Sequence, residues 1–365
     1  MERLVILTSS FYPVKGGLQK YIKDLGLKLS DKYDVVIVTG SDFMGDDVPK
    51  SYEIEGLSVL RFDTLKLGGL VFLKSFISLI KIYRILKQAD IIHHQDVKFI
   101  PYLPVIAKKF NSIKLYLSSH GYIYHNDRNG KIKSLYMKYF SWLSKSYDKV
   151  INVSYNDEEI ANEFKLRNTA TIIEGVDYSK FVNLSEIPKE GSLFYFGRVS
   201  ANKGIDRLIN CISIDSGLHL KVVGKPESKE YMESLNQLVK KRGLTEHVTF
   251  LGPLEDQELF EELKHVEFIV LPSLFEGFGI TLIESLATGA KVITSDIKAY
   301  QDIAKELDCT AFLFDFSQPN KEQRFADKVL DLRGKPYERD QVAQKLMKFD
   351  FDNMVKQIIK IYEAD

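Results

Sequence analysis

The sequence predicts an α/β protein built from two doubly wound domains in tandem, and three observations support this fold class. Short, continuous apolar runs alternate with helix-like stretches along the chain, a pattern typical of parallel sheets covered on both faces. The alternation is interrupted once by a polar segment and then restarts. The chain has 365 residues, which is enough for two domains of ordinary size.

The strands are predicted by apolar runs of four to six residues. In the first half these runs lie at residues 4–8, 35–39, 57–62, 90–94, 115–119, 149–153 and 171–174. In the second half they lie at residues 193–196, 218–223, 248–251, 268–271, 291–294 and 311–314. Helical stretches between the strands predict the crossovers that parallel strands require.

The domain boundary is predicted by the polar segment 182–191, which contains Pro188 and Gly191 and is typical of a linker. We therefore expect one domain at residues 1–182 and a second at residues 183–349. Apolar residues recur on one helical face between residues 351 and 362. We expect this last segment, residues 350–365, to form a helix that packs back on the first domain.

Composition and charge narrow the function classes. A chain with 45% hydrophobic and 27% charged residues is neither disordered nor fibrous. The 50 basic and 50 acidic residues give zero net charge, which argues against a nucleic-acid partner. However, residues 1–180 carry a net charge of +6 and residues 181–365 a net charge of −6. The two halves therefore differ in the partners that their charges favour.

The cellular compartment is predicted from what the sequence lacks. Cys211 and Cys309 have no metal-ligand spacing and fit a reducing compartment as small apolar groups. No run of about 18 apolar residues could span a bilayer. We expect a cytoplasmic protein.

Three loops that follow predicted strands are candidate ligand sites, because open α/β sheets bind ligands at the carboxyl ends of their strands. Gly16 and Gly17 precede the first helix and favour close approach of an anion. Arg198 and Lys203 follow the first strand of the second half and suit a diphosphate. The alternatives without a function stay open: a plain turn at Gly16-Gly17, and solvated surface charges at Arg198 and Lys203.

The third loop contains Gly277 and Gly279 between two glutamates, Glu276 and Glu284. Its N–H groups could hold a phosphate group. On a helix, eight residues rise about 12 Å. That separation is too long for the carboxylate pair of a glycosidase, which lies about 5–9.5 Å apart. The glutamates therefore better suit hydrogen bonds to sugar and ribose hydroxyls. The alternative for Glu284 is a solvated helix carboxylate without a function.

Together these loops resemble the retaining GT-B glycosyltransferases of family GT4. The family signature is two glutamates separated by seven residues, here Glu276 and Glu284. The resemblance also includes Gly16-Gly17, His120 after a strand, and the segment from Gly197-Arg198 to Lys203-Gly204. It extends over nearly the whole chain, although Glu174 stands where the family usually has asparagine.

The resemblance implies an enzyme with two Rossmann-like domains that face each other across a cleft. The first domain would handle the acceptor and the second would bind the nucleotide sugar. The residues implied in catalysis are Glu276, His120, Arg198 and Lys203. The residues implied in donor binding are Gly16, Gly17, Gly197, Arg198, Lys203, Gly224, Leu254, Glu276, Phe278, Gly279, Ile280 and Glu284.

The resemblance also implies how the sites would work. Arg198 and Lys203 would neutralise the leaving diphosphate, Glu276 would contact hydroxyls of the transferred sugar, and Glu284 would bind the ribose. The sequence shows no cluster of metal ligands, so we expect a metal-independent enzyme without a cofactor. A UDP- or GDP-linked sugar would be the donor. A glycan or polyprenyl-linked acceptor would receive the sugar in an α-linkage by front-face displacement, in the assembly of surface glycans, glycolipids or glycoproteins.

A membrane partner is predicted from the basic part of the first half. Residues 66–149 hold 15 basic and 4 acidic residues. Two stretches, residues 70–87 and 131–149, mix lysines with apolar and aromatic residues, as helices that lie on anionic membranes do. We expect peripheral contact with the inner membrane face through them. The alternative is a buried helix whose lysines form the solvated edge.

Three other functions remain as alternatives. The same fold could bind a nucleotide sugar as a scaffold without turnover. It could also belong to a GT-B phosphorylase or epimerase relative, although phosphorylases of the glycogen type are much longer. A Rossmann dehydrogenase is disfavoured, because the G-x-G-x-x-G fingerprint is absent after the first strand.

Overall fold

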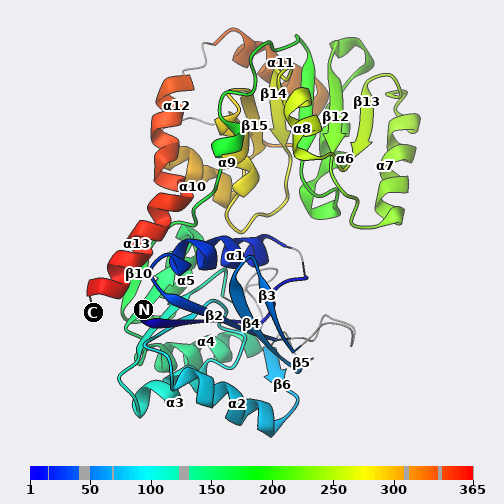
Figure 1. Cartoon of the computed structure of the whole chain (residues 1–365). Helices are drawn as coiled ribbons and strands as arrows, with labels where there is room; N and C mark the ends of the chain where they lie inside the picture. The colour runs from blue at the N-terminus through cyan, green and yellow to red at the C-terminus, as the bar shows by residue number, and fades with distance from the viewer. Residues whose placement is uncertain are drawn as a thin grey trace. The chain divides into compact units, whose positions relative to one another are not determined.

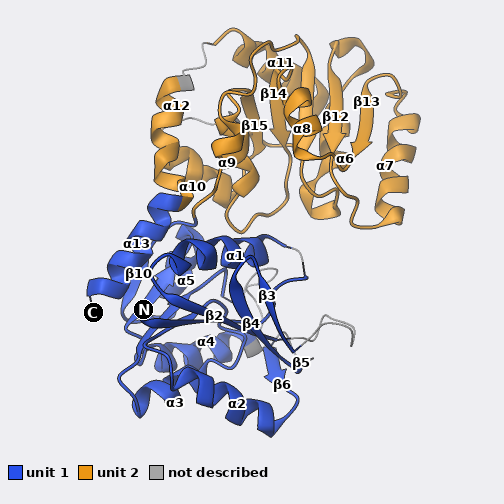
Figure 2. Ribbon diagram, viewed as in Figure 1, with its two compact units in different colours: residues 1–174, 352–365 blue, residues 175–351 orange. Residues whose placement is uncertain are grey.

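The computed structural model describes residues 1–14, 16–40, 50–67, 70–122, 131–307, 312–335 and 339–364. They form two compact units, which Figure 2 colours separately. Unit 1 comprises residues 1–174 and 352–365, and unit 2 comprises residues 175–351. Both units consist of a largely parallel sheet with helices, which confirms the predicted fold class. Cys211 is buried in unit 2, and Cys309 lies outside the described residues.

The boundary between the units differs from the prediction, since it falls after Glu174 rather than after residue 182. The polar segment 182–191 is not a free linker. The backbone N–H of Asn183 donates to the carbonyl of Ala287 at 2.9 Å, and the N–H of Ser185 donates to Thr288 at 2.8 Å. Polar composition does not distinguish a linker from a surface strap whose backbone groups find partners, and this segment is such a strap on unit 2.

The unit 1 sheet has eight strands in the order β10-β9-β8-β7-β1-β2-β4-β3. Only the pairing of β3 with β4 is antiparallel. The strands are β1 (Arg3–Thr8), β2 (Asp34–Gly40), β3 (Ser51–Ile54), β4 (Leu57–Phe62), β7 (Ile91–His94), β8 (Lys114–Ser118), β9 (Lys149–Asn152) and β10 (Thr169–Thr171). A separate antiparallel hairpin is formed by β5 (Thr64–Leu67) and β6 (Leu70–Leu73).

The helices of unit 1 cover both faces of its sheet (Figure 1). They are α1 (Gly17–Ser30), α2 (Phe76–Leu86), α3 (Tyr102–Lys109), α4 (Lys131–Ser144), α5 (Tyr155–Glu163) and α13 (Phe351–Ala364). Strand β8 shows why residues on both faces of the sheet are apolar. Leu115 and Leu117 pack in the core with α2, α3 and α4, whereas Tyr116 points to the other face and contacts Tyr362 of α13.

The last helix therefore belongs to unit 1. The hydroxyl of Tyr362 lies 2.5 Å from Nδ1 of His93 on β7, and its ring lies 4.9 Å from the ring of Tyr116. Lys114 Nζ donates to the carbonyl of Tyr362 at 2.7 Å. The apolar face predicted for this segment is the face that packs, because Met354, Val355 and Ile358 are buried together with Tyr362.

The unit 2 sheet has six parallel strands in the order β13-β12-β11-β14-β15-β16. The strands are β11 (Ser192–Phe196), β12 (His219–Val223), β13 (Val248–Gly252), β14 (Phe268–Leu271), β15 (Lys291–Ser295) and β16 (Phe312–Phe314). The helices are α6 (Ile205–Ile209), α7 (Lys229–Lys241), α8 (Asp256–Leu263), α9 (Ile280–Ala287), α10 (Lys298–Glu306), α11 (Lys321–Arg333) and α12 (Arg339–Leu346).

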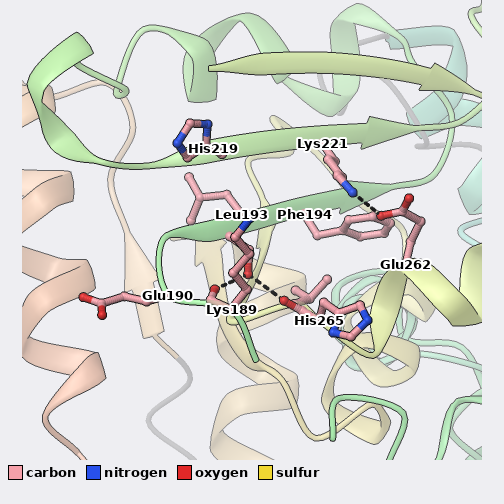
Figure 3. Close-up of a pocket in the computed structure, with 10 residues that line it drawn as sticks. Lys189, Glu190, Leu193, Phe194, His219, Lys221, Glu262 and His265 are labelled. Atoms are coloured by element: carbon pink, nitrogen blue, oxygen red, sulfur yellow. Dashed lines mark hydrogen bonds and ion pairs between the residues drawn. The ribbon is translucent and has the colours of Figure 1, made fainter. Parts of the chain in front are cut away.

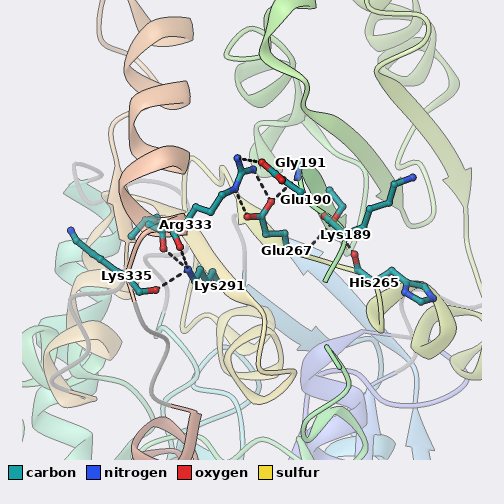
Figure 4. A network of polar contacts seen from close by, with 10 residues as sticks. Lys189, Glu190, Gly191, His265, Glu267, Lys291, Arg333 and Lys335 are labelled. Atoms are coloured by element: carbon teal, nitrogen blue, oxygen red, sulfur yellow. Dashed lines mark hydrogen bonds and ion pairs between the residues drawn. The ribbon is translucent and has the colours of Figure 1, made fainter. Parts of the chain in front are cut away.

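A polar network fixes the amino ends of two unit 2 strands to the end of α11 (Figure 4). Arg333 forms a bidentate pair with Glu267, at 2.6 and 2.9 Å, and Nη1 of Arg333 also pairs with Glu190 at 2.8 Å. Lys291 Nζ donates to the carbonyl oxygens of Leu332, Arg333 and Lys335. These donors satisfy carbonyl groups that the end of a helix leaves without partners.

The stretch 70–87 is not one helix. Its first residues form β6, and α2 begins at Phe76 after Ser75, whose side chain accepts a hydrogen bond from the N–H of Ile77. The apolar run at 70–73 fits a strand because it pairs with β5 in the hairpin. None of the helices in the described part of the chain is both long and apolar enough to cross a membrane.

Candidate active site

The order of the unit 2 strands defines one preferred ligand position. From β11 the chain proceeds to β12 and β13 on one side, and later to β14, β15 and β16 on the other side. The switch point therefore lies between β11 and β14. In open α/β sheets, ligands bind at the carboxyl ends of the strands at such a switch point.

Two predicted residues meet at this position. Lys203 follows β11, Glu276 follows β14, and Lys203 Nζ lies 2.6 Å from Oε1 of Glu276. The side chains are only 13% and 14% exposed, respectively. The ion pair is thus largely excluded from water. In such a partly buried environment the attraction between two charges is stronger than at a protein surface. The structure joins two residues that are 73 positions apart in the sequence.

Two further groups hold the same carboxylate oxygen. The hydroxyl of Ser273 donates to Oε1 of Glu276 at 2.7 Å, and the hydroxyl of Tyr300 on α10 donates to it at 3.2 Å. Burial, together with the charge of Glu276, raises the pKa of Tyr300 well above its usual value. This hydroxyl therefore stays protonated and remains a donor. The three donors orient the Glu276 carboxylate and bind only one of its oxygens.

Arg198 is placed near the same edge but outside this cluster. Its side chain is exposed, and its carbonyl accepts a hydrogen bond from the hydroxyl of Tyr195 at 2.7 Å. Within the described residues, no hydrogen bond or ion pair joins Arg198 to Lys203 or Glu276. The two predicted cations are thus not equivalent, because Lys203 is fixed by a partner and Arg198 extends into solvent.

The predicted glycines shape the backbone at this edge. Gly197 follows β11 and Gly224 follows β12, with positive φ values of 139° and 148°. A Cβ atom on Gly224 would lie 1.6 Å from the carbonyl oxygen of Gly197. No side chain fits between these two loops, so glycine is required at residue 224 for the backbones to approach each other.

The remaining residues of the predicted donor site lie around α9 and β13. Gly279 caps the helix in a left-handed conformation, Phe278 is buried before it, and Ile280 is the first helical residue. Glu284 is half-buried one turn into α9, and Leu254 is half-buried after β13. Both follow carboxyl ends of unit 2 strands, on the same edge of the sheet as Lys203 and Glu276.

Unit 1 has its own switch point, between β1 and β7. Gly16 and Gly17 follow β1, and α1 begins at Gly17 after an extended Gly16. His120 follows β8 and has a left-handed φ of 41°, and its Nε2 lies 2.8 Å from Oε1 of Gln95, which follows β7. The ring of Tyr21 on α1 packs edge-on against His120 at 5.0 Å. Gly16, Gly17 and His120 thus lie at the carboxyl edge of the unit 1 sheet.

Sequence reasoning missed the partners of the predicted residues. Ser273 and Tyr300 hold Glu276, and Gln95 holds His120. Ser273 and Gln95 could have been found, because each closely follows a predicted strand and is polar. Tyr300 carries no such signal, since it reaches the site from within an amphipathic helix.

A cavity of about 110 Å³ in unit 2 lies away from these residues (Figure 3). Its walls include Ser192 and His219, where β11 and β12 begin, and the ion pair of Lys221 with Glu262. It is therefore at the amino ends of the strands, opposite the edge where ligands bind in this fold class.

Comparison with known proteins identifies the family. The family model "Glycosyl transferases group 1" matches residues 179–346, and the model "Glycosyltransferase Family 4" matches residues 15–180. The two matches together extend over most of the chain and divide close to the boundary between the units.

The chain is a family 4 glycosyltransferase.

Curated relatives and solved structures agree with this assignment. A GDP-mannose:cellobiosyl-diphosphopolyprenol α-mannosyltransferase of Xanthomonas campestris is 24% identical over 83% of this chain and 81% of its own length. The O-antigen biosynthesis glycosyltransferase WclY of Escherichia coli is 28% identical over 64% of this chain and 68% of its own. The structure of HepE from Anabaena in complex with UDP matches with a TM-score of 0.73 at 17% identity, covering 100% of both chains. The fold is therefore that of the GT-B glycosyltransferases.

Proposed function

We propose that this glycosyltransferase moves a hexose from a UDP- or GDP-linked sugar to a polyprenyl-linked or other glycan acceptor and forms an α-linkage with retention. The observation that carries the proposal is the Lys203–Glu276 pair at the switch point of unit 2. It combines a cation for a leaving phosphate with an oriented carboxylate for sugar hydroxyls. The mannosyltransferase among the relatives supports a lipid-linked acceptor, since its name includes a diphosphopolyprenol.

The reaction breaks the bond between the anomeric carbon and the donor phosphate oxygen. The acceptor oxygen forms its bond to the same face of the sugar, and the acceptor's proton passes to the departing phosphate. Negative charge grows on that phosphate, so fixed donors there lower the barrier. In this proposal Lys203, Arg198 and the N–H groups of residues 278–280 supply those donors.

The other assigned roles follow from the same proposal. Glu276 accepts hydrogen bonds from hydroxyls of the transferred sugar through the oxygen that Lys203, Ser273 and Tyr300 leave open. Glu284 binds the ribose, and Gly224 and Leu254 lie beside the base. In unit 1, His120 binds sugar hydroxyls while Gln95 holds its ring, and Gly16 and Gly17 approach the diphosphate. The reaction needs no metal ion.

Peripheral contact with an anionic membrane is part of the proposal, because a polyprenyl-linked acceptor resides there. Helix α2 buries only two of its residues, Ile82 and Leu86, and leaves Phe76 and Ile77 exposed. On α4, Leu135 and Trp142 are 70% and 65% exposed. The alternative is helices with one face buried and a solvated lysine edge, and the burial of Ile82 and Leu86 in the core fits it. Large exposed apolar groups beside lysines favour a membrane surface.

The proposal is tested by three measurements on the purified full chain. Thermal shift with UDP, GDP and ADP identifies the nucleotide, and we expect UDP or GDP to raise the melting temperature. Turnover is then measured with the matching nucleotide sugars and a short polyprenyl-diphosphate glycan, with and without EDTA. The anomer of the product is read by NMR. Loss of turnover with EDTA would contradict metal independence, and a β-linked product would contradict retention.

A further inference from the structure

The turn that carries His120 has an unusual backbone. His120, Gly121 and Tyr122 follow one another with φ values of 41°, 82° and 48°, all in the left-handed region. A residue with a side chain rarely adopts this conformation, because its Cβ atom crowds the following carbonyl oxygen. Of the three residues, only Gly121 adopts it without strain. Such strain persists only where the surrounding structure holds it, and it gathers at functional sites.

One carboxylate holds this turn on both sides of His120. Asp157 lies in the first turn of α5, and its Oδ2 accepts a hydrogen bond from the hydroxyl of Ser119 at 2.6 Å. The same oxygen accepts a hydrogen bond from the backbone N–H of Gly121 at 3.1 Å. Ser119 and Gly121 are the neighbours of His120 in the chain. Asp157 therefore fixes the chain immediately before and immediately after His120.

The far end of the turn is attached to the sheet by other groups. The backbone N–H of Tyr122 donates to the carbonyl of Ser119 at 3.0 Å. The hydroxyl of Tyr122 donates to Oδ1 of Asn152, the last residue of β9, at 2.7 Å. Neither bond involves residue 120 or 121, so Asp157 holds the middle of the turn from α5.

Asp157 is poorly explained by stability alone. It is 0% exposed, and burial raises the pKa of its carboxyl, although its hydrogen bonds with Ser119 and Gly121 oppose that rise. A carboxylate that is taken out of water costs free energy, which an uncharged side chain would avoid. The cap of α5 is supplied by Ser154, whose hydroxyl oxygen accepts from the N–H of Asp157 at 3.1 Å. The carboxylate is therefore not needed as the cap.

The ring of His120 is held by a separate set of contacts. Its Nε2 lies 2.8 Å from Oε1 of Gln95, and the ring of Tyr21 packs edge-on against it at 5.0 Å. These contacts orient the ring, but its position depends on where the backbone of residue 120 lies. The bonds to Asp157 therefore complement the bond to Gln95, because they set that backbone position.

We propose that Asp157 is a positioning residue for the transfer reaction, which fixes the left-handed turn at residues 119–122 and thereby places His120 for the transferred sugar. Asp157 acts through the turn and does not contact the substrate. The inference deepens the proposed function and rests on it, because it takes from that proposal the assignment of His120 to the sugar.

The test is a double-mutant cycle between Asp157→Leu and His120→Ala in the full chain. We expect Asp157→Leu to lower kcat about 100-fold, since a misplacement of about 1 Å can cost that much. The nucleotide-induced thermal shift should persist, because the nucleotide is assigned to unit 2. In the His120→Ala background, Asp157→Leu should lower turnover no further, because no imidazole remains to be positioned.

Two more variants separate positioning from stability. Asp157→Asn should keep kcat within about fivefold of the natural chain, because one amide oxygen can accept the same two hydrogen bonds, although less strongly than a carboxylate. Ile160→Ala is the control for stability, since Ile160 is buried in the core on the same helix. Its truncation should destabilise unit 1 in urea unfolding and leave turnover per folded molecule unchanged.

Several outcomes would overturn the inference. Additive losses in the double variant would show that Asp157 does not act through His120. Equal losses of turnover in Asp157→Leu and Ile160→Ala would show a purely structural role. If Asp157→Leu does not fold by circular dichroism, Ser119→Ala replaces it in the cycle, because it removes one of the two donors, and unchanged turnover or additive losses there would be equally decisive.

Failure of the proposed function would look different. Full turnover in the single variant His120→Ala would remove His120 from the transfer reaction, and the inference about Asp157 with it. Additive losses in a cycle in which His120→Ala is itself impaired would leave the proposed function intact and contradict only the role of Asp157.

Discussion

Lys203 Nζ lies 2.6 Å from Glu276 Oε1, and the two residues follow β11 and β14. These are the neighbouring strands between which the strand order of the unit 2 sheet reverses. The pair is largely buried, and Ser273 and Tyr300 donate to the same oxygen. This arrangement is a fixed set of charges at the position where the fold binds ligands. The proposed transfer reaction depends on it, and it can be tested one group at a time.

Replacing Lys203 by alanine should reduce kcat about 100- to 1,000-fold, because a donor that stabilises developing charge contributes about 2.7–4 kcal/mol to the barrier. The measurement is steady-state turnover with the nucleotide sugar that the thermal-shift screen selects. Lys221→Ala is the matched control, since Lys221 forms an ion pair of 2.5 Å with Glu262 in the same unit, beside the cavity at the opposite end of the strands. A similar loss in both variants would contradict a specific role for Lys203.

Glu276→Gln should lower turnover strongly while the nucleotide-induced thermal shift persists, because this carboxylate is assigned to the sugar and not to the nucleotide. The amide keeps the size of the side chain but loses its charge and its pairing with Lys203. Near-normal turnover in this variant would remove Glu276 from the site. Loss of the nucleotide-induced thermal shift would indicate that Glu276 binds the nucleotide instead of the sugar.

Tyr300→Phe should reduce turnover by about tenfold, the equivalent of one weak hydrogen bond to a charged group. The hydroxyl is 3.2 Å from Oε1 of Glu276, and two other donors remain when it is removed. Tyr231→Phe is the control, because the hydroxyl of Tyr231 donates to Asp206 at 3.0 Å in the same unit. Both variants should lose comparable stability in chemical denaturation. Only Tyr300→Phe should affect turnover, and equal kinetics would show a purely structural role.

Gly224→Ala should destabilise unit 2 and abolish donor binding, because its Cβ would lie 1.6 Å from the carbonyl oxygen of Gly197. Gly252→Ala is the comparison, since Gly252 also has positive φ but a Cβ atom there would meet nothing within 4 Å. The strain of the left-handed backbone alone costs about 1–2 kcal/mol. We expect Gly224→Ala to lose about 1–3 kcal/mol more than the control in urea unfolding. Equal losses would mean that the two loops separate without penalty.

The stability of unit 1 should fall as the pH falls below about 6.5, because two buried histidines are held neutral. Burial, with smaller contributions from His120 and His94, lowers the pKa of His93 to about 3, and burial lowers the pKa of His94 to about 4. Below pH 6.5 the unfolded chain binds protons at these residues and the folded chain does not, so the equilibrium shifts toward unfolding. Above about pH 6.5 both states are neutral and the effect disappears.

His93→Gln isolates one of these contributions. Each such histidine adds at most about 1.4 kcal/mol per pH unit to the slope. Urea unfolding at several pH values should therefore show a shallower decline for the variant than for the natural chain. Parallel curves would show that His93 becomes protonated in the folded state.

Tyr362→Ala should destabilise unit 1 by about 3–5 kcal/mol, the usual cost of removing a large buried aromatic side chain. Tyr362 is 1% exposed and contacts His93, Tyr116 and Tyr33. Tyr362→Phe keeps the ring and removes only the hydroxyl, so it should lose less. Differential scanning calorimetry of the full chain measures both, and an unchanged melting temperature for Tyr362→Ala would show that α13 does not stabilise unit 1.

Much of the fold can be predicted from the local pattern of apolar and polar residues in the sequence. Each buried parallel strand is a continuous apolar run, so the sequence predicts β1, β11 and β14 within a residue or two of their bounds. The short antiparallel strands β3 and β5 escape prediction, because they lack such apolar runs. Strand β6 does have an apolar run, Leu70–Leu73, but it lies in the stretch 70–87, for which the sequence predicts a helix. The segment 182–191 resembles a linker because its composition shows polarity but not the backbone partners that bind it to unit 2.

The sequence by itself determined the two α/β units, the glycines at the strand ends, and the residue types that suit phosphates and sugars. All of these follow from short-range patterns. Only the tertiary structure decided that Lys203 pairs with Glu276, that Tyr300 reaches the same carboxylate, and that Arg198 stays outside the cluster. The physical reason is strand order. Neighbours in a parallel sheet are set by crossovers and core packing, and these bring together side chains that are far apart in the sequence.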